Sequence, residues 1–478
     1  MTLIAQLPAE ILLHIFALAR DRHDAEWPQY DDPSIYVHFR RRLNPVVSLS
    51  HVSRAWRTLV ISTPHLWSTL YLDGEIDGDR AEAKAMFWTR RAALLDDAQS
   101  VRGDGIPQLP GVTTLVLTRI QDWAPDDLKG LCEALELLHL GSLKRVRFSW
   151  MGGGLSTDEN RQLQSTFRLL VPSAPTLASL TVFTPSHLRI GFSLPRLGHT
   201  FSALEELEIR SCKIALPASD ANLVPGFLPR YAGESDWNPL TALKRLVLVG
   251  PIWRLRYQDG TIASPVVSSA DLPALEYAHL GSTAPPVFWN LLSHRTGSLR
   301  HLHLEDHFDH PHQPEPDLLL CFANLHTLSL TRSASLGTRI LEGAVRLGTA
   351  MRFPVLETLT LAGAQLRQAH LDLLDRAPSL RRLDLSDTTV AGPPPSAANP
   401  VPLQLSLPTL PKLERLALLH VEWIGMRDVV GMLESSQLPA LRRIVTESDL
   451  VDLDRWKLRE RGIALYDEDG QSRCLSAS

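Results

Sequence analysis

The sequence predicts an α/β protein in which a short helical region at the N-terminus precedes a long array of repeated strand units. Apolar residues recur at helical spacing in the first 72 residues, and a unit of the form apolar-x-x-apolar-x-apolar recurs through most of the remainder. The chain has 478 residues. One compact domain typically has roughly 150 to 200 residues, so several domains or one extended repeat array are expected.

The first predicted helix follows Leu7 in the stretch LPAEILLHIF. Pro8 is suited to the start of a helix because its φ angle is already near the helical value and its missing N–H needs no partner there. Glu10 adds a negative charge to the positively polarised first turn. The apolar stripe is too wide for a freely exposed helix and must be covered. It comprises Ile11, Leu12, Ile15, Phe16 and Leu18.

The segment from Val46 to Trp67 predicts two more short helices, one around Pro45 to Leu49 and one from Ser53 to Ile61. Ser53 is expected to be the N-cap of the second, and Pro64 is expected to end it. Three such short helices are too few to form a stable domain alone.

These motifs resemble the F-box family, which has the pattern LP-x-E-I-L, an apolar pair, V-S-x-x-W-R and P-x-L-W. HVSRAWRTLV followed by STPHLWSTLYL is similar to the F-box of large fungal families. Asp21 to Arg42 separates the helices by more than the motif usually allows, so residues 21–42 are predicted to be an insertion in a helical domain spanning 1–72. The matching residues are Leu7, Pro8, Glu10, Ile11, Leu12, Val46, Val47, Val52, Ser53, Trp56, Arg57, Pro64, Leu66 and Trp67.

The resemblance implies a function without bond chemistry of its own. The helices would dock a Skp-type adaptor of an SCF-type cullin-RING E3 ubiquitin ligase, and the rest of the chain would bind the target protein. The adaptor contacts that the resemblance implies are Leu7, Pro8, Ile11, Leu12, Ile15, Phe16, Val47, Val52 and Trp56.

The composition argues against several other classes of protein. The formal charge of −5 does not favour a nucleic-acid binder that neutralises many phosphates. The four cysteines stand far apart, so neither a disulfide framework nor a cysteine-based zinc site is predicted, and a reduced cytoplasmic or nuclear location is expected. No apolar run reaches 18 residues, and Pro8, Glu10 and His14 interrupt the apolar N-terminus, so neither a membrane span nor a signal peptide is predicted.

After a predicted helix from Ala81 to Leu95 in a connecting segment (73–108), the repeated unit dominates the sequence. The last two apolar residues of each unit are two positions apart, so both point to one face of a short strand. Successive units begin 24 to 39 residues apart. The units begin at Val112, Leu143, Leu177, Leu204, Leu243, Leu275, Leu299, Leu325, Leu356, Leu380 and Leu413, with a truncated twelfth at Leu441.

This array resembles leucine-rich repeat proteins across residues 109–466, which implies a solenoid of parallel strands joined by helices or loops. It departs from the regular consensus at the position usually held by Asn or Cys. A last helix from Asp449 to Glu460, a left-handed stop at Gly462 and a final strand from Ile463 to Tyr466 are expected before a tail at 467–478. Residues 251–272, 306–317 and 391–402 are predicted to be loops because they are polar or proline-rich.

The motifs of common active sites are missing from the sequence. MGGGL at Met151 lacks the lysine of a phosphate-binding loop, and neither G-x-S-x-G nor H-E-x-x-H occurs. No catalytic residue, cofactor or metal is therefore predicted. Histidines cluster with interleaved acids at His294, His301, His303, His307, His310 and His312. Histidines in a polar loop lack the fixed geometry of a zinc site, so side chains that are simply solvated are the favoured interpretation. A partner-binding or pH-responsive surface is the next alternative, ahead of a metal site.

The outward face of the strands is the predicted target-binding surface, because solenoids usually bind partners on their concave sheets. The same face also carries Arg382, Asp384, Arg415 and Arg443. The predicted target contacts are Arg145, Arg147, Glu206, Glu208, Arg210, Arg245, Tyr277, His279, His301, His303 and Glu305.

Two alternatives remain open at this stage. The N-terminal helices would only cap the open end of the array if the protein were a scaffold unconnected to ubiquitin. An enzyme would need a catalytic constellation assembled from distant repeats.

Overall fold

The structure is a computed structural model, and most of its described residues lie in the helices and strands. The described residues are 7–26, 45–93, 111–119, 123, 126, 130–131, 143–149, 175–183, 189–191, 201–210, 213–216, 240–249, 252–254, 272–281, 298–305, 324–331, 334–348, 352–390, 405–421, 424, 426–447 and 452–466. The chain forms two compact units, one of 1–213 with 219–240 and one of 214–218 with 241–478.

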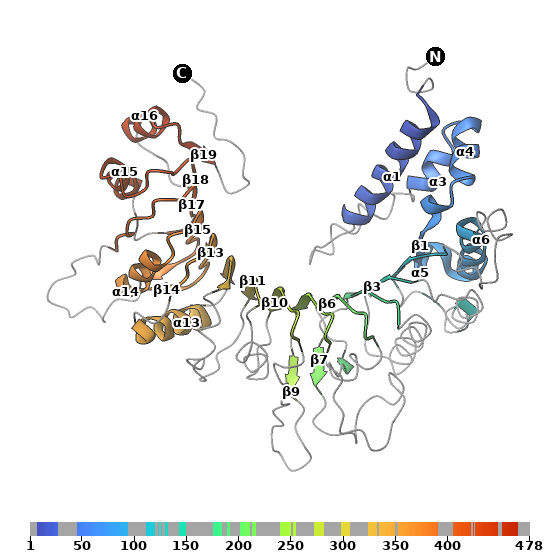
Figure 1. Ribbon diagram of the computed structural model, residues 1–478, viewed down its shortest axis with the longest axis horizontal. Coiled ribbons are helices and arrows are strands. Elements are labelled where there is room, and N and C mark those ends of the chain that lie inside the picture. The colour runs from blue at the N-terminus through green and yellow to red at the C-terminus, as the bar shows by residue number, and fades with distance from the viewer. Residues whose placement is uncertain are drawn as a thin grey trace, which may run out of the picture. The chain divides into compact units, whose positions relative to one another are not determined.

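Three helices open the first unit: α1 (Ala9–Glu26), α3 (Pro45–Ser50) and α4 (Arg54–Ile61). They pack on one another (Figure 1). The Ser53 side chain accepts a hydrogen bond from the Trp56 N–H at 3.1 Å, which confirms the predicted N-cap of α4. Pro8 precedes α1, and its carbonyl accepts from the Leu12 N–H.

A strand and a second helical layer follow directly. The short helix η2 (Pro64–Trp67) leads into β1 (Thr69–Asp73), α5 (Gly74–Asp77), η3 (Gly78–Arg80) and α6 (Ala81–Ala93). Helix α6 packs on η2 and β1 through Ala85, Trp88 and Ala92, which are buried as their helical spacing predicts. The indole N–H of Trp67 donates to the Val60 carbonyl at 2.9 Å and so ties η2 to α4.

Fourteen strands of the described residues form one parallel sheet, in the order β1-β2-β3-β4-β6-β8-β10-β11-β12-β13-β15-β17-β18-β19. Each of the twelve predicted units supplies one strand, which begins two residues after the first apolar residue of that unit. The first unit of the fold holds β1, β2 (Thr114–Thr118), β3 (Arg145–Ser149), β4 (Ser179–Phe183) and β6 (Glu206–Arg210).

The second unit continues the same pattern through the predicted last strand. Its sheet strands are β8 (Arg245–Val249), β10 (Tyr277–Gly281), β11 (His301–Glu305), β12 (Thr327–Thr331), β13 (Thr358–Thr360), β15 (Arg382–Asp384), β17 (Arg415–Leu418), β18 (Arg443–Thr446) and β19 (Ala464–Tyr466). Its helices are α13 (Ala334–Leu347), α14 (Gln368–Asp372), η12 (Leu373–Arg376), α15 (Met426–Glu434) and α16 (Asp452–Glu460). Gly462 follows α16 at φ 69°, which confirms the predicted left-handed stop.

The core lies behind the inward face of the sheet. In β11, for example, Leu302 and Leu304 are buried and the neighbouring His301 and His303 are partly exposed. The outward face of the sheet is only partly exposed to solvent. At the middle position of the strands on this face, the short Thr360 of β13 is half-buried. Six other short side chains at this position are buried, because the flanking strands and the residues two places away cover them. These buried residues are Val116, Thr181, Val247, Ser329, Ala417 and Val445.

Short strands lie outside the long sheet. β14 (Gln365–Leu366) pairs with β16 (Thr389–Val390), and β7 (Lys213–Leu216) pairs with β9 (Ile252–Arg254). A further strand is β5 (Arg189–Gly191). Because β9 lies in the predicted loop at 251–272, that prediction was wrong at its start.

Two other boundaries differ from the sequence prediction. Helix α1 continues through Glu26, so the first residues of the predicted insertion at 21–42 extend a helix. The sheet begins at β1, well before residue 109, because WSTLYL places Trp67, Leu70 and Leu72 as a repeat unit does, and all three are buried. The repeat pattern was therefore visible in the sequence, with Trp67 in place of the first leucine.

Some predictions fall outside the described residues. These are the rest of the insertion, all four cysteines, MGGGL, the loops at 306–317 and 391–402, and the histidines at 294, 307, 310 and 312. Among the helices that the structure describes, none combines the length and the apolar character needed to cross a bilayer.

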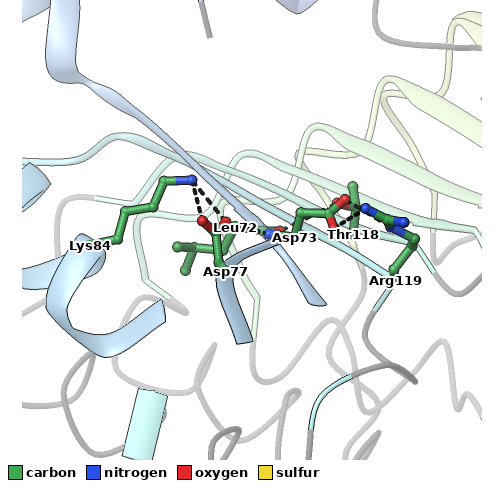
Figure 2. Close-up of polar contacts among 6 residues, drawn as sticks. All are labelled: Leu72, Asp73, Asp77, Lys84, Thr118 and Arg119. Carbon is green, nitrogen blue, oxygen red and sulfur yellow. Dashed lines mark hydrogen bonds and ion pairs between the residues drawn. The ribbon is translucent and has the colours of Figure 1, made fainter. Parts of the chain in front are cut away.

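A polar cluster joins β1 to β2 at their carboxyl ends (Figure 2). The Asp73 carboxylate accepts from the Thr118 hydroxyl at 2.8 Å and from the Arg119 Nε at 3.0 Å, and it also pairs with the second guanidinium nitrogen. Asp77 accepts from the Asp73 N–H at 2.8 Å and from the Lys84 ammonium. Arg119 is 5% exposed, so its charge depends on Asp73 for compensation.

Gly74 is required where the chain leaves this cluster. A Cβ atom at position 74 would lie 2.1 Å from the Arg119 carbonyl oxygen, a backbone atom that moves only with β2. We predict that Gly74→Ala lowers the free energy of unfolding by roughly 2 to 3 kcal/mol, measured by urea denaturation. In the matched control Gly431→Ala, a Cβ meets nothing within 4 Å on helix α15, and stability should be equal or higher. Equal effects of the two substitutions would contradict this account of Gly74.

Candidate functional site

Helix α1 carries two adjoining apolar stripes with different surroundings. Leu12 and Phe16 lie one turn apart and are 7% and 0% exposed, so they form the core of the helical bundle. Ile11, Ile15 and Leu18 are 48%, 41% and 54% exposed. Their spacing of four and three residues places them on one face of the helix, and that face remains uncovered in the structure.

Exposed apolar residues are concentrated in this region. Seven large apolar side chains are exposed in the described residues, and four of them are Ile11, Ile15, Leu18 and Val52. Val52, in the turn between α3 and α4, is 61% exposed. We call these four residues the N-terminal apolar surface. Several exposed apolar groups within one small bundle are typical of a site for another protein.

Packing beneath this surface holds α1 in place. The Phe16 and Trp56 rings lie 4.8 Å apart at 57°, which fixes α1 against α4. The Arg20 guanidinium donates to the His65 carbonyl and so connects the far end of α1 to η2.

The nine predicted adaptor contacts therefore fall into different environments. Pro8, Ile11, Ile15 and Val52 are exposed, and Leu7, Val47 and Trp56 are half-buried. Leu12 and Phe16 are buried inside the bundle, so in this structure they support the surface and do not form it. Leu18 was not among the predicted contacts, although its spacing from Ile11 and Ile15 places it on the same exposed face.

The predicted target contacts of the first unit lie on β3 and β6, with β4 between them. Arg145 is in register with Ser179 and then Glu206, and Ser179 donates to the Glu206 carboxylate at 3.0 Å. Glu208 pairs with Arg210 on the same strand. Part of the charge on this face is thus neutralised within the unit.

The predicted target contacts of the second unit form a continuous cluster on β8, β10 and β11. The Arg245 guanidinium carbon lies 4.1 Å from the centre of the Tyr277 ring, which is 5.2 Å from the ring of His303. His279 lies 5.7 Å from His303, and its Nε2 is 3.5 Å from a Glu305 carboxylate oxygen. We call Tyr277, His279, His301 and His303 the ring cluster.

Two imidazoles of the ring cluster are held in the neutral form. Burial, followed by the nearby His279, His301 and Arg245, lowers the pKa of His303 from 6.5 to about 4. Burial, followed by His326 and Arg300, also lowers the pKa of His301, and Glu276 opposes that shift. Both rings therefore present an uncharged aromatic surface at neutral pH.

The ring cluster has no metal-site geometry among the residues that the structure describes. No three His, Cys, Asp or Glu side chains in those residues are placed to hold one ion. The His301 Nδ1 instead lies 3.1 Å from the Thr327 hydroxyl.

We predict a pH dependence of stability that originates at His303. Its pKa is lower in the folded chain than in the unfolded chain, so the unfolded chain binds more protons as the pH falls from 6.5 towards 4. The folded chain should lose roughly 1 to 2 kcal/mol in that window, allowing for partial solvent screening. His303→Gln should reduce the difference between urea midpoints at pH 7.5 and pH 4.5. Ser329→Ala, in register with His303, should keep it, and an unchanged difference in His303→Gln would contradict the assignment.

Residues 4–73 match the family model described as F-box-like. None of the curated proteins matches the chain. The matched residues include the N-terminal apolar surface and end with strand β1. The match supports the interpretation that the chain is an F-box protein. An F-box-like domain implies that a Skp-type adaptor of a cullin-RING complex is a partner.

Proposed function

We propose that this protein is a substrate receptor of an SCF-type cullin-RING ubiquitin ligase. The N-terminal helices dock the Skp-type adaptor, and the strand array binds the target protein. The observation that carries the proposal is the exposure of Ile11, Ile15, Leu18 and Val52 within the segment that matches the F-box-like model. An apolar surface that the described residues leave uncovered is what an adaptor site requires.

The competing proposal, that the helices only cap the array, accounts for other elements of the first unit. Strand β1, with η2 and α6, covers the end of the array next to β2. The outer face of α1 covers nothing in the described residues, since Ile11, Ile15 and Leu18 are exposed. Capping explains β1 and α6, and it leaves the outer face of α1 without a role.

In this proposal the chain supplies position and no bond chemistry. It would hold a target so that lysines of the target reach the ubiquitin-charged enzyme, and proximity alone contributes much of such a rate increase. The proposal includes a cytoplasmic or nuclear location, in keeping with cysteines that suggest neither a disulfide framework nor a zinc site.

We further propose that the array is of the leucine-rich repeat type, as in the large fungal F-box families, and that its outward face binds the target. Parallel strands at each predicted unit and buried leading leucines support the repeat assignment. The eleven predicted target contacts are all exposed or half-buried, so each side chain is accessible to a partner.

The test is co-expression with a Skp-type adaptor, followed by measurement of the affinity of the purified chain. We predict that Ile11→Asp with Ile15→Asp weakens adaptor binding by roughly 100-fold or more, because two apolar contact residues would then bring unpaired charges into the interface. Circular dichroism should show an unchanged fold, since both side chains already face solvent.

Two further variants serve as controls. Trp456→Asp changes a residue that is 57% exposed on α16 and should leave adaptor binding intact. Phe16→Ala removes a fully buried ring and should lower stability by roughly 3 to 5 kcal/mol. If Ile11→Asp with Ile15→Asp unfolds the chain as Phe16→Ala does, or keeps the affinity for the adaptor, the receptor proposal is wrong.

A further inference from the structure

Three arginines of the second unit lie side by side on the outward face of the sheet. Arg382, Arg415 and Arg443 are the first residues of β15, β17 and β18, and they are paired in register. All three side chains are exposed. Neighbouring strands are about 4.8 Å apart, so three positive charges start within about 10 Å of one another. We call these residues the arginine row.

This arrangement is unfavourable for the isolated fold. Like charges directly opposite each other on neighbouring strands destabilise a sheet. Within the described part of the chain, none of the three guanidinium groups forms an ion pair with a carboxylate. Glu414 pairs instead with Arg381 at 3.2 Å. One Asp384 oxygen accepts from the Ser386 hydroxyl at 2.6 Å and from its N–H, so this carboxylate forms no ion pair with the row, and its single charge offsets only part of the three positive charges.

A ring contact orients the arginine at one end of the row. The Arg443 guanidinium carbon lies 3.7 Å from the centre of the Tyr466 ring on β19. Such stacking uses the face of the guanidinium and leaves its N–H edge available to an acceptor. At the other end the row continues through Thr358 and Thr327, whose side chains are neutral.

We propose that the arginine row binds an acidic segment of the target protein, with carboxylates of that segment between adjacent guanidinium groups. The inference deepens the proposed function and rests on it for the identity of the partner as a target. Guanidinium groups match carboxylates through paired N–H···O bonds, and the partner removes the repulsion within the row.

The same observations favour a peptide over a nucleic acid. Nucleic-acid affinity at physiological salt usually comes from many phosphate contacts, whereas the row offers three cations on a chain of net charge −5. A short acidic segment can be bound by those three cations alone. Because the three arginines are in register on neighbouring strands, they also favour an extended peptide that crosses β15, β17 and β18.

The test measures binding of a fluorescein-labelled peptide of eight glutamates to the full chain by fluorescence anisotropy at low and physiological salt. Replacing Arg382, Arg415 and Arg443 by Gln should weaken binding about tenfold, at a few-fold per exposed ion pair. The matched control replaces Arg352, Arg427 and Arg459 by Gln. It removes the same charge from exposed positions outside the row and should keep the wild-type affinity.

Each other result overturns the proposal. An unmodified chain that fails to bind the peptide, or equal weakening by both triple variants, would show that the row is not a specific site. If a single-stranded octanucleotide binds more tightly than the peptide, and its binding also depends on the row, the row is assigned to nucleic acid instead.

Adaptor binding is measured on the same samples, so failure of the row leaves the receptor proposal standing if the adaptor still binds. Circular dichroism checks folding, which the loss of like-charge repulsion should not impair.

Discussion

The parallel pairing of β1 with β2 is the interaction on which the rest of the first unit depends. β1 belongs to the segment that matches the F-box-like model and is also the first strand of the sheet. Five residue pairs hold the two strands in register, and the Asp73–Arg119 ion pair closes their carboxyl ends. The helices are therefore continuous with the array through hydrogen-bonded backbone, and no flexible linker separates β1 from α4 and η2.

Because of this continuity, residues 7–93 both cover the end of the array and leave one apolar helix face exposed. A repeat array needs its end covered, and η2 with α6 covers β1. A docking helix needs an uncovered apolar face, and α1 keeps one because its inward stripe is satisfied by Trp56 and the bundle. With 3.6 residues per turn, positions 12 and 16 face the bundle while 11, 15 and 18 face solvent.

Much of the fold followed from local patterns, and the exceptions depended on distant partners. The leading apolar residues, eleven leucines and Val112, predicted twelve strands because each unit buries the same positions whatever its neighbours are. The burial of Val247 and Ser329 was missed because it depends on the strands alongside. The Arg119–Asp73 pair joins residues 46 apart, and no local pattern reveals it. At the candidate site the sequence predicted Ile11, Ile15 and Val52 as contacts, yet it did not separate them from the buried Leu12 and Phe16.

The outward face of the second unit combines two kinds of surface along one line of in-register residues. His301 lies next to Tyr277 in that line, and its lowered pKa keeps it uncharged at neutral pH, so these two rings offer aromatic contact beside the single charge of Arg245. The arginine row, further along the same line, supplies charge without apolar contact. Long-range attraction would therefore act first at the arginines, since charge acts over a Debye length and ring contacts only at van der Waals distance. A target segment with acids at one end and aromatic or apolar residues towards the other would match both surfaces.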